Sequence, residues 1–263
     1  FDRATGKEVW RSVADPAGYC TPIVIEHAGR QQLVCWTPEN VCGLDPRSGA
    51  QLWSVPYKVT MGVSIATPIF GDGIVFVSGY WEGSKAIRLG REPTEHALAW
   101  EENRWLRGLL SQPVVRDGYA YLLDKHHGLV CFELATGKKL WDDANQMTPR
   151  GRNPQASMVW LNAHEVAGVE SSSPQTTSAA TLLKAGGSNT RPQRPDRAII
   201  LNSEGDLILA RINPNGYHEQ SRTNIIRPTE RGPIWAHPAY AGTHVYARSD
   251  AELVCVSLLE PAN

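Results

Sequence analysis

The chain has 263 residues, with 26 Lys and Arg against 27 Asp and Glu, which gives a formal net charge of −1. This balance excludes the strongly basic surface of most nucleic-acid-binding proteins, so we expect no nucleic-acid partner. No stretch approaches the roughly 20 apolar residues of a membrane-spanning helix, so we expect no transmembrane segment. The chain begins at Phe1 rather than Met, and we interpret it as a fragment or a mature form without a visible signal peptide.

A ten-residue phrase that ends on tryptophan recurs along the chain. It occupies residues 1–10, 44–53 and 132–141, with an acid in its second position, Gly in its sixth and Trp in its tenth. With one further tryptophan included, the spacings are 43, 47 and 41 residues. A period of roughly 40 residues with one turn and one aromatic is typical of a β-propeller. The residues of this docking phrase are Asp2, Gly6, Trp10, Asp45, Gly49, Trp53, Trp100, Glu133, Gly137 and Trp141.

Short runs of branched and aromatic residues between Gly-containing turns predict the strands. Residues 1–10 would supply the outer strand of one blade, and five further blades follow in chain order. The expected strands of those blades are 22–25, 32–36, 41–44 and 51–53; 68–70, 73–77, 84–87 and 97–100; 112–115, 119–123, 129–133 and 138–141; 157–160, 198–201, 206–210 and a weak strand near 217–219; and 234–238, 244–247 and 252–256.

The predicted fold class is therefore all-β, a propeller of four-stranded antiparallel blades. We expect residues 1–259 to form one partial propeller of about five blades plus one outer strand, and the complete protein to have seven or eight. A five-bladed ring closed by residues 1–10 is the alternative. The polar, Ser/Thr/Pro-rich stretch 167–197 predicts a flexible insertion within one blade, and 260–263 form a C-terminal tail.

The spacing within the phrase has a physical reason. Gly permits the positive φ of a tight turn, and the acid can accept hydrogen bonds from the turn amides. The Trp on the outer strand can then pack against the neighbouring blade, which buries on the order of 200 Å². A later blade keeps this spacing but has Gln220 in the place of Trp, so we expect it to dock more weakly.

The five cysteines contain no Cys-x-x-Cys pair, which gives a zinc or redox site little support. Cys131 and Cys255 occupy the same repeat position, and we expect both to be small buried residues on core strands. Cys35 and Cys42 could face each other across a turn, and a disulfide between them stays open.

The phrase resembles the tryptophan-docking motif of pyrroloquinoline-quinone-type, or quinoprotein-like, propellers. That motif runs Ala-x-Asp-x-x-x-Gly-Lys-x-x-Trp, and it is seen at 43–53, 131–141 and, truncated, at 2–10. The resemblance covers nearly the whole chain outside 167–197 and looks closest to bacterial repeat proteins named PQQ-binding-like β-propellers. It implies a periplasmic or otherwise extracytoplasmic location. The fold serves both quinoprotein dehydrogenases and non-enzymatic scaffolds, such as the propeller lipoprotein of the outer-membrane barrel assembly machinery.

The resemblance implies cofactors only for the enzymes. Quinoprotein dehydrogenases carry a pair of adjacent cysteines and an Asp, Asn and Glu set that holds Ca²⁺ against the quinone. This chain has no adjacent cysteine pair and no acid-rich cluster on the expected cofactor face. We therefore predict a non-catalytic binding or scaffold propeller without a cofactor or metal; the alternative is an alcohol or sugar dehydrogenase that uses PQQ and Ca²⁺.

One face of the predicted propeller collects the loops between second and third strands and those that lead into the next blade. We expect this face to bind a protein or a glycan, and the chain to be a monomer. His126 and His127 are adjacent and would chelate one ion poorly, because neighbouring strand residues point to opposite faces. The alternative for several tryptophans is packing between blades. The candidate residues of the binding face are Trp36, Trp81, Arg104, Trp105, Arg107, His126, His127, Trp235 and His237.

Overall fold

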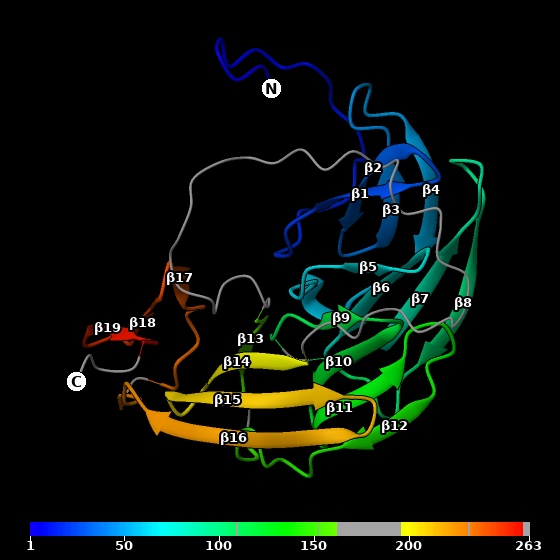
Figure 1. The fold of residues 1–263 in the computed structure, drawn as a ribbon. Coiled ribbons are helices and arrows are strands. Elements are labelled where there is room, and N and C mark those ends of the chain that lie inside the picture. Colours follow the sequence, from blue (N-terminus) through cyan, green and yellow to red (C-terminus); the bar gives the residue numbers. More distant parts are fainter. Residues whose placement is uncertain (109, 152, 162–195, 231, 260–263) are drawn as a thin grey trace, which may run out of the picture.

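Five separate antiparallel sheets make up the fold (Figure 1). The computed structural model describes residues 1–108, 110–151, 153–161, 196–230 and 232–259. The first three sheets, in chain order, are β1 (Ile23–His27), β2 (Arg30–Trp36), β3 (Asn40–Leu44) and β4 (Gln51–Pro56); β5 (Ile69–Gly71), β6 (Ile74–Gly79), β7 (Gly83–Leu89) and β8 (His96–Glu102); and β9 (Val114–Arg116), β10 (Tyr119–Asp124), β11 (Gly128–Glu133) and β12 (Lys139–Asp142).

The last two sheets and a single 3₁₀ turn complete the described elements. They are β13 (Ala156–Trp160), β14 (Arg197–Asn202), β15 (Asp206–Asn213) and β16 (Gly216–Asn224); β17 (Ala239–Ala241), β18 (His244–Arg248) and β19 (Leu253–Ser257); and η1 (Thr60–Gly62). Within the described ranges there is no helix long and apolar enough to cross a bilayer.

Within each sheet the strands lie side by side in chain order, as in a propeller blade. We number the sheets blade 1 to blade 5. The blades follow one another in an arc, with β5, β9 and β13 toward its inside and β8, β12 and β16 toward its outside (Figure 1). The predicted all-β propeller of four-stranded antiparallel blades is confirmed.

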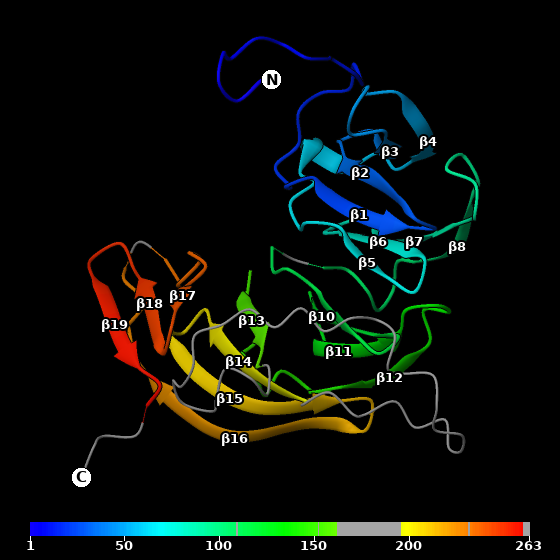
Figure 2. The ribbon, with the colours of Figure 1, turned by 45° about the horizontal axis from the view of Figure 1, so that its top comes forward.

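The ring is open between the N-terminal segment and blade 5. Blade 5 has three described strands, and residues 1–10 form a turn in which the Gly6 amide donates to the Asp2 carbonyl, but no strand. Both views place β19 away from the N-terminal segment (Figures 1 and 2). The five-bladed ring closed by residues 1–10 is therefore wrong for this structure, because Trp10 is held against blade 1 instead.

Blade 4 differs from expectation in its outer strand. The strand expected to be weak near 217–219 is β16, which has nine residues and pairs with β15 from Asp206 to Asn213. Backbone pairing supplies this strand, so it does not need the missing tryptophan. The insertion expected at 167–197 lies outside the described residues except for its last two, and Arg197 already belongs to β14. The expected tail 260–263 lies outside them too.

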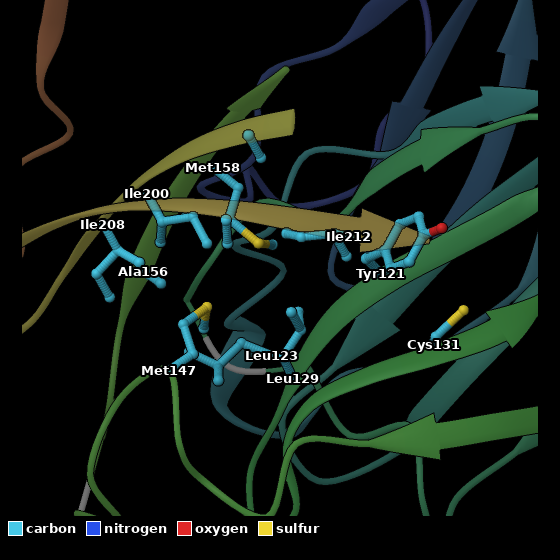
Figure 3. Close-up of a cluster of buried hydrophobic side chains, with 12 residues drawn as sticks. Tyr121, Leu123, Leu129, Cys131, Met147, Ala156, Met158, Ile200, Ile208 and Ile212 are labelled. Carbon is cyan, nitrogen blue, oxygen red and sulfur yellow. The ribbon is translucent and has the colours of Figure 1, made fainter. Parts of the chain in front are cut away.

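The apolar core is divided among the contacts between successive blades. One buried cluster joins blade 3 to blade 4, with Tyr121 and Leu123 on one side and Met158 and Ile200 on the other (Figure 3). Comparable clusters join blades 1 and 2, blades 2 and 3, and blades 4 and 5. Because each blade is a single sheet, its apolar faces are covered by its neighbours and by little else.

Three of the four regularly spaced tryptophans donate their indole N–H to the neighbouring blade. The acceptor carbonyls are those of Pro46 for Trp10 at 3.1 Å, Leu134 for Trp100 at 2.9 Å, and Asn213 for Trp141 at 3.0 Å. Each acceptor stands three residues before a glycine where the third strand leads into the fourth, and in blade 4 this glycine is already the first residue of β16. The same contact thus recurs from one blade to the next.

The turn glycines leave room for these rings. A Cβ on Gly137 would stand 2.8 Å from the Trp100 ring, and one on Gly49 would stand 2.5 Å from the Trp10 ring. Both glycines have positive φ, +72° and +73° respectively, a conformation that a side chain disfavours. The phrase therefore needs Gly for two reasons at once, the turn and the close approach of the indole.

Trp53 makes a different contact. Its indole N–H donates to the Gln32 side chain of its own blade at 2.7 Å, and its ring lies over Gly43, where a Cβ would clash with it. On the side of blade 2 its ring meets His96, at 6.0 Å between centroids. The turn of blade 2 that precedes His96 lacks the repeated phrase, so it offers no equivalent acceptor turn.

The contact of Trp100 with Gly137 can be tested by substitution. Gly137→Ala should lose about 1–2 kcal/mol of stability from its positive φ, plus about 1–3 kcal/mol from overpacking against the ring. Gly6→Ala is the matched control, because Gly6 has φ +69° in the same phrase and no heavy atom within 4 Å of the added Cβ. Urea unfolding followed by circular dichroism measures both, and equal losses would contradict the contact.

Candidate functional site

The loops that carry the predicted binding residues meet on one face, which we call the loop face. It consists of the turns between second and third strands and the connections between blades. Contacts across blades hold it together: the Arg107 amide in the connection from β8 to β9 donates to Asp124 at the end of β10, at 3.0 Å. The Tyr57 hydroxyl, after β4, donates to the Gly83 carbonyl at the start of β7, at 2.5 Å.

Asp124 is a buried carboxylate that organises the loop face of blade 3. Its Oδ1 accepts the amide protons of His126 and His127 at 2.8 and 2.9 Å, while its Oδ2 accepts that of Arg107. The same Oδ1 lies 2.6 Å from Nδ1 of His127. The turn between β10 and β11 and the connection from blade 2 are therefore fixed by one side chain.

Two more carboxylates act in the same way. Glu102, at the end of β8, accepts the amide protons of residues 104, 105 and 106. Asp143, just after β12, accepts those of Leu129, Asn145 and Met147. Burial raises the pKa of Asp143 even though three amides donate to it. Sequence reasoning missed these three acids; the available signal is an acid at or just after a strand end that leads into a loop.

The nine candidates of the binding face differ in exposure. The indoles of Trp81 and Trp105 are each 44% exposed and that of Trp235 is 49% exposed. Trp36 is only 2% exposed, because its ring stacks on Tyr57 at 5.4 Å between centroids. Trp36 therefore packs inside the structure, as the alternative for several tryptophans had it, and offers no surface to a partner.

Five residues form a connected patch across blades 2 and 3. The ring of Trp81 meets that of Tyr80 edge-on at 4.6 Å, and Lys125 places its Nζ 3.7 Å from the centroid of Tyr80. The ring of Trp105 lies 5.9 Å from that of His127, two residues after Lys125. We call Tyr80, Trp81, Trp105, Lys125 and His127 the aromatic patch.

The remaining candidates lie around this patch or apart from it. Arg104 and His126 are exposed neighbours of patch residues, and Arg107 is half-buried. Burial and the positive charge of Arg107 lower the pKa of His126. Trp235 and His237 belong to the connection into blade 5, where His237 contacts Ser157 at 3.2 Å. They therefore form a second location on the connections rather than part of the aromatic patch.

A cleft of about 570 Å³ opens between blades 1 and 2 on the loop face. Its walls include Tyr57 and Lys58 after β4, Glu82 in the turn after β6, and Arg104 after β8. Only Arg104 among these was expected at a binding face. A volume in this range suits ligand sites, which measure about 300–1,000 Å³.

The described cysteines are all free. Cys35 and Cys42 are opposite each other in the pairing of β2 with β3, but no disulfide joins them. Cys131 is buried as expected, and burial raises the pKa of its thiol to about 12. Cys255 is exposed, contrary to expectation, because no described strand covers the outer side of β19.

The role of Asp124 can be tested by Asp124→Ala. Four hydrogen-bond donors lose their acceptor, so stability should fall by about 1–3 kcal/mol. The hydrogen-exchange rates of the Arg107, His126 and His127 amides should increase, while those of the strand amides stay unchanged. Asp250→Ala, which removes an exposed carboxylate, is the control. Unchanged exchange at the three amides would show that Asp124 does not hold the loops.

One solved structure supports this fold, and two further structures match with TM-scores below 0.5. The outer-membrane assembly factor BamB from Moraxella catarrhalis matches with a TM-score of 0.55 and 16% identity over 95% of this chain and 63% of that one. A designed protein, Ika8, matches with a TM-score of 0.47 and 8% identity over 93% of this chain and 62% of that one. A europium-containing methanol dehydrogenase matches over 48% of this chain and 24% of its own, with 14% identity and a TM-score of 0.36.

Comparisons at the level of sequence identify the family. The search among curated proteins finds no match. The family model described as "Outer membrane protein assembly factor BamB", a PQQ-like repeat model, matches residues 1–143, just over half of the chain. The chain spans 63% of the length of the Moraxella protein. On the repeated phrase, the blades and this match, the chain belongs to the PQQ-like, BamB-type family of β-propeller repeat proteins.

Proposed function

We propose that the chain is a non-catalytic binding propeller that recognises a protein partner through the aromatic patch of its loop face. The observation that carries this proposal is the exposure of two indoles, Trp81 and Trp105, at 44% each on loops that the fold holds firmly. Trp, Tyr and Arg dominate the binding energy of protein interfaces. Exposed rings of this kind would be buried by a partner.

The hydrogen bonds beneath the patch support the proposal. Glu102 accepts the Trp105 amide at 2.6 Å, and Asp124 holds the turn that carries Lys125 and His127. An interface whose loops are already ordered loses less conformational entropy when it binds. The patch therefore combines aromatic anchors with a preorganised backbone, which suits protein recognition.

The family description favours a protein partner over the glycan that was equally open from the sequence. It also supports a periplasmic or otherwise extracytoplasmic location, and we propose that location for this chain. We propose that the chain acts as a monomeric scaffold, with the partner rather than a second copy covering the patch. A glycan as the ligand of the patch is then an outcome that the experiments below would reveal.

The dehydrogenase alternative needs a Ca²⁺ and quinone site. Ca²⁺ takes six to eight oxygen ligands. In the part of the chain that the structure describes, no group of three or more His, Cys, Asp or Glu side chains could hold a metal ion. The carboxylates of the loop face already accept backbone amides, as Asp124 and Glu102 do. These observations support the scaffold over the dehydrogenase.

The aromatic patch can be tested by Trp81→Ala combined with Trp105→Ala. Truncation of one hot-spot ring costs about 2 kcal/mol, or about 30-fold in affinity, and this is the minimum loss that we expect of the double variant. Proteins captured from an extract of the source organism by wild-type chain are quantified by mass spectrometry and compared with the variant, and the strongest is then titrated as a purified protein.

Trp235→Ala is the matched control, because this indole is as exposed but lies on the connection into blade 5. It should keep the partner. If the double variant captures the same partner as well as wild type does, or if Trp235→Ala loses it equally, the aromatic patch is not the site. Circular dichroism checks that both variants keep their β-sheet spectrum.

Addition of pyrroloquinoline quinone with CaCl₂ tests the alternative directly. A ligand that binds the folded state at a hundred times its Kd stabilises it by about 2.7 kcal/mol, which raises the melting temperature. We expect no such rise and no reduction of a redox dye with an alcohol or sugar present. A clear rise together with dye reduction would overturn the scaffold proposal.

A further inference from the structure

We propose that the cleft between blades 1 and 2 binds an acidic segment of the protein partner. This inference rests on the proposed function and names the chemistry of one part of the partner. The cleft measures about 570 Å³ and lies on the same loop face as the aromatic patch. Arg104, in its wall, is the direct neighbour of Trp105 in the patch.

The acids that line the cleft already have partners. Glu101 pairs with Lys85 at 2.8 Å, and Glu102 accepts three backbone amides. Glu82 accepts the Thr60 amide at 2.7 Å through Oε1, while its Oε2 has no hydrogen-bond partner but is buried, out of reach of a ligand. The negative charge of the cleft is therefore largely used within the fold.

Two cations of the cleft remain available to a ligand. Lys58 is 82% exposed and reaches Glu39 only at 4.0 Å, a distance at which a surface pair contributes little. Arg104 is exposed, and within the described residues its guanidinium has neither an ion pair nor a hydrogen bond. A guanidinium matches a carboxylate with two parallel hydrogen bonds. The unused charge of the cleft is thus positive and suits carboxylates.

The floor of the cleft favours a peptide over a sugar. Tyr57 is its aromatic residue, but the ring is 3% exposed because it stacks on Trp36 and lies below Lys85, whose Nζ is 5.5 Å from the centroid. A sugar that binds by stacking on an aromatic ring would therefore find no open ring face here. The hydroxyl of Tyr57 is also engaged, since it donates to Gly83 and accepts the Gly79 amide. What the cleft presents is a buried floor with exposed cations above it.

The test uses a fluorescein-labelled hexapeptide of alternating Asp and Glu, with a Lys hexapeptide for comparison. Fluorescence anisotropy should show that the wild-type chain binds the acidic peptide, more weakly as salt is raised, and not the basic one. Lys58→Glu combined with Arg104→Glu should lower the affinity for the acidic peptide at least about tenfold, because charge attraction becomes repulsion.

Arg30→Glu combined with Arg91→Glu is the matched control. It makes the same change of charge at two exposed arginines on the opposite face, at the start of β2 and in the turn between β7 and β8. This control should bind the acidic peptide as wild type does. Equal weakening by both double variants would mean general charge attraction and would overturn the cleft, as would no binding at all.

The outcomes also separate the cleft from the aromatic patch. If Trp81→Ala with Trp105→Ala loses the partner but the acidic peptide does not bind the wild-type chain, the peptide site in the cleft is wrong and the proposed function stands. If the peptide binds as expected but the partner stays bound to the tryptophan variant, the patch is wrong. Binding of polygalacturonate in place of the peptide would overturn the cleft as a peptide site and point to an acidic glycan.

Discussion

The structure depends on the need of each single-sheet blade to have its apolar faces covered by its neighbours. Buried clusters therefore form between blades rather than within one central core. The indole N–H of Trp100 reaches the Leu134 carbonyl of the next blade, and the ring packs on the turn glycine beside it. A hydrogen bond and apolar contact from one side chain thus fix both the distance and the register of successive blades.

The same arrangement separates the docking contacts from the loop face that we propose for binding. The docking contacts of blades 1, 3 and 4 lie at the end of the sheet where the third strand meets the fourth, so they leave the loops at the other end uncovered. Those loops are ordered by acids such as the buried Asp124, whose carboxylate oxygens accept hydrogen bonds from backbone amides. Exposed aromatic rings and cations, such as Trp105 and Arg104, stand beside these ordered loops and make up the surface that we propose for recognition.

The regular strands and turns of the blades could be predicted from the repeated phrase, whereas departures from the repeat could not. The strands of blade 3 were predicted nearly as they occur, because Gly-containing turns and alternating residues are local signals. The length of β16 and the exposure of Cys255 could not be predicted in the same way. Pairing with β15 gives β16 its length, and the open edge of β19 leaves Cys255 exposed. Both features depend on neighbouring strands rather than on local sequence.

The sequence by itself determined the all-β blades, the turn glycines and the tryptophan of each phrase, because spacing along the chain sets backbone conformation and side-chain direction. Only the tertiary structure decided which tryptophans are exposed on the surface. Trp36 and Trp81 both come at or near the end of a second strand, yet Tyr57 from the following connection covers the first while the second is exposed. The exposure of a side chain therefore depends on which residues a neighbouring loop places over it. The cleft beside Arg104 likewise depends on tertiary structure, because its walls come from two different blades.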